Sequence, residues 1–153
     1  MRGIERHTTE LFAAALSVAL GIGLVAALAS KDQFFFGQFA YVWGPQGAII
    51  LLSLLFGPRT ASVIGTSIAL SLYLVAFVLW ERSISNENGL AWLGYFFSFP
   101  GAAIGAIIAA IYIERHSTAS SVIRLSLIAF AFTCIGLAIN QMLVCSTVMY
   151  CGR

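Results

Sequence analysis

The sequence predicts an all-α integral membrane protein, folded as one polytopic bundle of five transmembrane helices. Of the 153 residues, 60% are hydrophobic and 9% are charged, whereas a soluble domain carries about 25% charged residues. Long apolar stretches recur along the chain, and the charged residues gather in the short segments between them. So few charges cannot cover a water-exposed surface, and most of the surface is therefore expected to face lipid or apolar protein. Residues 1–153 are expected to form a single transmembrane domain.

The first predicted span covers residues 11–30, which is about the 20 apolar residues that a membrane-crossing helix needs. The segment also has features of a secretory signal peptide, because Arg2 and Arg6 precede it and small residues end it. Glu5 and Glu10 dilute the positive charge that such a leader requires. The pattern therefore favours an uncleaved helix.

The second span is the least regular. The apolar run between two Gly-Pro pairs makes a helix of only about 20 Å, which is shorter than a hydrocarbon core of about 30 Å. The aromatic residues before it extend the span to 36–57, with a kink or break at Gly44 and Pro45 and an end at Gly57 and Pro58. In the alternative, this segment is a short re-entrant helix and the chain crosses four times.

Three further spans are predicted at 61–80, 91–113 and 121–145. Positive charges separate five crossings from four, because cytoplasmic loops collect Lys and Arg. With four crossings, the Lys and Arg residues divide evenly between the two sides. With five crossings and a cytoplasmic N-terminus, more of them lie inside (Arg2, Arg6, Arg59, Arg115, Arg124) than outside (Lys31, Arg82, Arg153). Five crossings are therefore favoured, and they place the C-terminus in the periplasm.

Small residues recur every four positions in several spans, which places them on one helix face and lets helices approach closely in lipid. The span that contains Pro100 has small residues on two faces, so we expect it to be the central helix. Pro100 is expected to kink it, and a carbonyl freed there needs a partner from a neighbouring helix. The stripes are Ala15, Ala19, Gly23 and Ala27; Ala61, Gly65 and Ala69; Gly101, Gly105 and Ala109; and Gly94, Ser98, Ala102, Ala106 and Ala110.

The last span carries polar residues seven apart, Ser126, Thr133 and Asn140, with Gly136 between the last two. Asn140 and Gln141 form the most polar pair inside any span. Interhelical hydrogen bonds of this kind contribute about 0.6–2 kcal/mol. They are expected to hold helices together, or to line a cavity or contact a partner. The predicted packing or partner-contact residues are Gly94, Ser98, Gly101, Gly105, Ala109, Thr133, Gly136, Asn140 and Gln141.

The sequence offers no catalytic set, because its ionisable residues lie at span ends or in loops and no carboxylate lies mid-membrane. We expect no enzyme, no cofactor and no metal site. Cys145 and Cys151 are expected to form a disulfide that closes a C-terminal hook in an oxidising compartment. A redox pair of the kind used by membrane thiol oxidases is the alternative. Cys134 is expected to be a buried apolar residue.

The size and span number resemble those of small bacterial inner-membrane proteins, including immunity proteins against pore-forming toxins. We expect a non-enzymatic protein of the cell inner membrane that acts through helix contacts with a membrane partner or with a second copy. An accessory subunit and an immunity protein both fit. A net charge of +2 without a basic run does not indicate nucleic acid. The alternatives are an oligomeric channel or transporter component that uses the stretch around Pro45, and an enzyme acting on lipids or thiols.

Overall fold

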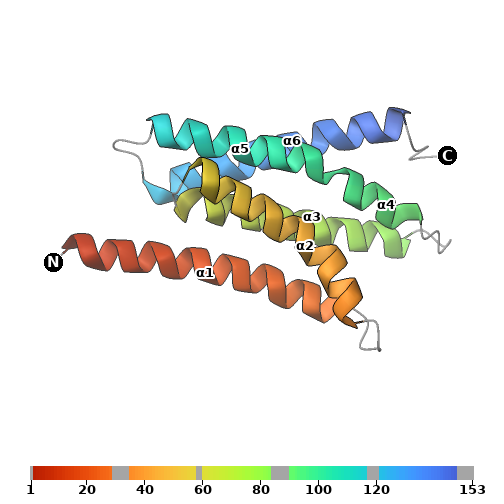
Figure 1. Cartoon of the computed structure of the whole chain (residues 1–153), viewed down its shortest axis with the longest axis horizontal. Coiled ribbons are helices and arrows are strands. Elements are labelled where there is room, and N and C mark those ends of the chain that lie inside the picture. The colour runs from red at the N-terminus through yellow and green to blue at the C-terminus, as the bar shows by residue number, and fades with distance from the viewer. Residues whose placement is uncertain (1, 29–34, 58–59, 84–89, 117–120, 148–153) are drawn as a thin grey trace.

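The computed structural model describes residues 2–28, 35–57, 60–83, 90–116 and 121–147. These residues are almost entirely helical, and no strand occurs among them. Figure 1 shows the helices running roughly alongside one another, with the first helix beginning at one end of the bundle and the last helix ending at the other. The helices are α1 (Arg2–Leu28), α2 (Phe35–Phe56), α3 (Thr60–Ser83), α4 (Leu90–Phe97), α5 (Phe99–His116) and α6 (Val122–Thr147).

Among the described residues, five segments are long and apolar enough to cross a membrane, and α4 and α5 together supply one of them. The prediction of a five-helix membrane bundle is therefore confirmed. The observed helices differ from the predicted spans mainly at their ends, since α1 begins at Arg2 and α3 continues to Ser83. The candidate spans are Glu10–Leu28, Phe35–Phe56, Thr60–Ser83, Leu93–His116 and Val122–Thr147.

The second helix is continuous through the first Gly-Pro pair. Its 22 residues make a helix of about 33 Å, which reaches across a bilayer and does not fit the re-entrant alternative. Pro45 lies inside α2 without breaking it, and the helix bends along its length in Figure 1, as an internal proline explains. The helix ends at Phe56, where Gly57 still donates its N–H to the Ser53 carbonyl at 3.2 Å. Pro58 lies outside the described residues.

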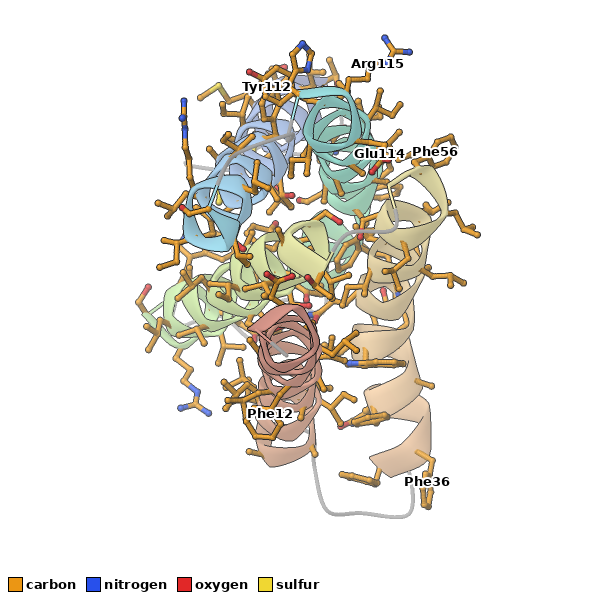
Figure 2. The ribbon with its side chains drawn as sticks, turned by 90° about the vertical axis from the view of Figure 1, so that its left-hand side faces the viewer. Phe12, Phe36, Phe56, Tyr112, Glu114 and Arg115 are labelled. Atoms are coloured by element: carbon orange, nitrogen blue, oxygen red, sulfur yellow. The ribbon has the colours of Figure 1, made fainter. Side chains whose placement is uncertain are left out.

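Helices α3 and α5 form the centre of the bundle. Half of the α3 span and half of the α4–α5 span are buried, whereas α1, α2 and α6 bury about a fifth of theirs. Helix α3 packs against α1, α2, α5 and α6, and α5 packs most extensively against α6. The predicted central position of the helix that contains Pro100 is therefore confirmed, and α3 shares that position. Viewed from the end in Figure 2, α1 lies low in the bundle, and α2 rises along one side from Phe36 at the bottom to Phe56 near Glu114 of α5.

The core has two parts of different composition. Where α3 and α6 begin and α5 ends, the buried side chains are small or aliphatic: Ala61, Ala109, Ile113, Leu125 and Ala129. Toward the other end the core includes aromatic rings, among them Phe77, Tyr95 and Phe99. Helix α5 runs from one part to the other. The aromatic part contains the interruption between α4 and α5, where the polar side chains of the candidate site meet.

Candidate functional site

The helix that contains Pro100 is interrupted at Ser98, which separates α4 from α5. Proline lacks an N–H and disrupts the helical hydrogen bonds of the preceding turn. Accordingly, Ser98 donates its N–H to the Tyr95 carbonyl three residues back, at 3.2 Å, and the pattern resumes with Ala102 N–H to the Ser98 carbonyl at 3.3 Å. The sequence predicted a kink in one helix, and the structure shows two helices instead. The break that was considered at Gly44 and Pro45 does not occur, because α2 is continuous through both residues.

Asn140 of α6 supplies the partner that the interrupted helix requires. Its Nδ2 donates a hydrogen bond to the Phe97 carbonyl, which closes α4. An unpaired backbone carbonyl within a bilayer is unfavourable by several kcal/mol, and Asn140 gives the last carbonyl of α4 a partner on another helix. The carbonyl that Pro100 itself leaves without a helical donor is that of Phe96, and for that carbonyl the expected neighbouring partner stays a prediction.

The carboxamide oxygen of Gln141, the next residue of α6, lies within hydrogen-bond distance of two hydroxyl groups. The Tyr73 hydroxyl lies 2.7 Å from Ser98 Oγ and 3.3 Å from Gln141 Oε1. Ser98 Oγ lies 3.0 Å from the Gly94 carbonyl and also contacts Gln141 Oε1. A hydroxyl has one hydrogen to donate, so the shortest arrangement is a chain from Tyr73 to Ser98 to Gln141. This chain joins α3, the helix break and α6.

A second part of the site joins α2 to α4. Gln46 Nε2 donates to the Tyr95 hydroxyl at 2.7 Å, and both residues are almost fully buried. The Tyr95 ring stacks on the Tyr73 ring, with centroids 5.4 Å apart and planes 7° apart. Stacking brings the two hydrogen-bonded parts together at the break. We call this set the polar cluster; its members are Gln46, Tyr73, Tyr95, Ser98, Asn140 and Gln141.

Three members of the polar cluster were not predicted as site residues: Gln46, Tyr73 and Tyr95. Gln46 carries a recognisable signal, because a carboxamide inside an apolar helix normally turns inward to a partner. The tyrosines carry a weaker signal, since tyrosine is common at membrane interfaces whatever its role. Their stacking depends on how α3 and α4 pack, which a linear pattern does not reveal.

The predicted small residues of α5 and α6 form a tight crossing. A Cβ added at Gly101 or Gly105 would overlap backbone atoms of α6, and one added at Gly136 would overlap the Gly101 carbonyl. Nearer the start of α6, Thr133 donates to the Ala129 carbonyl at 2.8 Å and lies 3.5 Å from Thr66 of α3. The remaining predicted residues, Gly94, Ser98 and Ala109, are buried within the same chain.

The stripe predicted on α1 has a different environment. Ala15, Ala19, Gly23 and Ala27 are all exposed. A Cβ added at Gly23 meets no atom of the described residues within 4 Å outside its own stretch of helix. By contrast, α1 packs on α3 through another face, where Gly21 would place its Cβ 3.2 Å from Ser71 Oγ. Helix α1 therefore has two small-residue faces, of which one is occupied.

Helix α2 also has a face of exposed small residues. Ala40, Gly44 and Ala48 are exposed and lie four residues apart. A Cβ added at Gly44 meets no other described atom within 4 Å. On the opposite side, Trp43 and Phe39 stack on each other at 6.2 Å and pack against the core. The small residues on these faces of α1 and α2 are therefore exposed, whereas the small residues of α5 are covered by α6.

The cysteines are in two chemical states. Cys145 is disulfide-bonded, and its sulfur lies 3.6 Å from the Gln141 Nε2 that donates to it. The expected partner, Cys151, lies outside the described residues, so that pairing stays a prediction. Cys134 is free and half-buried in α6. Within the described residues, no group of three His, Cys, Asp or Glu side chains is placed to hold a metal ion.

The fold and the site together define an integral membrane protein of the polytopic helical class. No protein-family model, no curated protein and no solved structure matches the chain. Its function is therefore argued from its own residues.

Proposed function

We propose that the protein is a non-enzymatic component of a bacterial inner membrane that acts through helix contacts with a membrane protein partner. An accessory subunit and an immunity protein that blocks a membrane-inserted toxin are both of this kind. The N-terminus lies in the cytoplasm and the C-terminus in the periplasm, as the distribution of Lys and Arg favours.

The observation that carries the proposal is the open small-residue face of α1. Helices associate in lipid through close backbone approach, which glycine and alanine permit. Close backbone approach of this kind occurs within the chain where α5 meets α6, whereas no helix among the described residues covers the stripe around Gly23. A partner helix placed there would make the same kind of contact as α6 makes with α5.

Photo-cross-linking tests the proposal in the native membrane. A photoreactive residue at Gly23 is expected to form one defined adduct, identified by mass spectrometry, with a partner protein or a second copy. The matched control is Ala131, an exposed alanine of α6, which is expected to give lipid adducts. Ala19→Leu should abolish the protein adduct because the bulky side chain prevents close approach. Lipid adducts alone at both positions would overturn the proposal.

The helix break favours one other function, an oligomeric channel or transporter component. Interrupted helices line polar cavities in many transporters, and the interruption at Ser98 is surrounded by carboxamide and hydroxyl groups. Solute flux into liposomes that contain the pure protein tests this alternative. Vesicles that stay tight under every ion and solute gradient would count against it.

A further inference from the structure

Helix α4 is an eight-residue segment that joins the rest of the bundle at the interruption. We propose that α4 is a hinged lid, which turns about Ser98 and covers Tyr73 and Gln141 of the polar cluster. This inference is independent of the proposed partner contact, because α4 lies away from the open face of α1.

The backbone at Ser98 has the features of a hinge. The bond from Ser98 N–H to the Tyr95 carbonyl is a tighter turn than the α-helical pattern, and Pro100 has no N–H to return to Phe96. Helical hydrogen bonds that would resist bending are therefore reduced at this point. Hinges in proteins are a few residues at the end of an element that absorb a change in backbone angles.

Two polar contacts and the packing of Tyr95, which is fully buried in the aromatic part of the core, hold α4 in its present position. Asn140 of α6 binds the Phe97 carbonyl, and Gln46 of α2 binds the Tyr95 hydroxyl. Tyr95 also stacks on Tyr73 of α3. We call the contacts of Asn140 and Gln46 the latch.

Helix α5, on the other side of Ser98, is fixed by its packing. Gly101 and Gly105 lie directly against the backbone of α6, so α5 cannot shift without separating the two helices. The packing of α4 against α5 and α6 is much less extensive. One side of α4 faces outward, with Leu93, Phe96 and Phe97 exposed. The difference across Ser98 predicts that α4 moves while α5 stays in place.

Opening of the lid would uncover the hydroxyl of Tyr73 and the carboxamide of Gln141. Both are half-buried in the closed arrangement, and the Tyr95 ring now covers the face of Tyr73. A polar recess would then open at the end of the bundle where α4 lies (Figure 1). Motions of this kind occur on a timescale of about microseconds to milliseconds.

Distances between spin labels test the hinge in the full-length chain in lipid nanodiscs. A Cys134→Ala background removes the free thiol. The reporting pair is Leu93→Cys on α4 with Leu127→Cys on α6, and the control pair is Ile104→Cys on α5 with the same Leu127→Cys; all three leucine and isoleucine side chains are exposed. Each pair is measured in the parent chain and in the latch variants Asn140→Leu and Gln46→Leu.

Loss of one latch hydrogen bond is expected to raise the ratio of open to closed α4 by about threefold. This appears as a new or larger second distance population in the reporting pair, with the control pair unchanged. Unchanged distances in both latch variants would overturn the proposal. Equal changes in both pairs would also overturn it, because the latch residues would then hold the whole bundle and not α4 alone.

Discussion

The seam between α5 and α6 and the outward face of α1 are built from the same residue types at the same spacing, yet they lie in different environments. At the seam, Gly101 and Gly136 bring two backbones into direct contact. On α1, Gly23 has open space beside it, and its neighbours on the stripe are exposed. The comparison distinguishes two roles of small residues in lipid. At the seam they pack the helices of the bundle together, and on α1 they form a face that is available to another helix.

The largest expected effect comes from adding a methyl group at each of these two glycines. Gly101→Ala should destabilise the protein by about 1–3 kcal/mol, because a Cβ cannot rotate away from the backbone that it overlaps. Gly23→Ala should not lower stability, since its Cβ would enter open space. Thermal unfolding of both variants in mild detergent measures the difference. Equal destabilisation by the two substitutions would remove the distinction between the seam and the face.

The next largest effect is expected at the helix interruption between α4 and α5, where Asn140 binds the backbone of α4. Asn140→Leu keeps a side chain of similar size but removes the donor to the Phe97 carbonyl. An interhelical hydrogen bond in a membrane contributes about 0.6–2 kcal/mol, and the loss here should fall within that range. The measurement is the free energy of unfolding of Asn140→Leu, compared with that of Ile139→Leu. Ile139 is the neighbouring residue and is exposed. Similar values for both variants would show that the carbonyl is satisfied without Asn140.

A smaller effect is expected for the buried pair of Gln46 and Tyr95. Their hydrogen bond is 2.7 Å long and links α2 to α4, and Tyr95→Phe retains the stacked ring while removing the hydroxyl. A double-mutant cycle with Gln46→Leu should give a coupling energy of about 0.6 kcal/mol, the average for such pairs in membranes. Additive effects of the two substitutions would contradict a direct bond.

The sequence predicted the helices better than it predicted the faces through which they pack. Apolar length indicated where the spans lie, the distribution of Lys and Arg favoured five of them, and carboxamides inside an apolar helix identified Asn140 and Gln141 as inward-facing. The small-residue stripes were equally regular on α1 and α5, so periodicity could not show that Gly23 stays open while Gly101 is covered. Tyr73 and Tyr95 were missed because their stacking arises from the packing of α3 against α4.

The smallest expected effect lies in the part of the bundle with small buried residues, at Thr66 and Thr133. Their hydroxyl oxygens are 3.5 Å apart, which is long for a hydrogen bond between hydroxyls. Thr133 already donates its one hydrogen to the Ala129 carbonyl at 2.8 Å, so it can only accept from Thr66 across that distance.

A double-mutant cycle of Thr66→Val and Thr133→Val, which preserves the branched shape, should therefore give a coupling energy below about 0.5 kcal/mol. The coupling energy of the two threonines could instead exceed that of Gln46 with Tyr95. Polar contacts would then contribute at least as much to the small-residue part of the core as to the helix interruption. A smaller coupling energy would indicate that close backbone packing, and not hydrogen bonding, stabilises the small-residue part of the core. The stronger hydrogen bonds would then lie at the helix break.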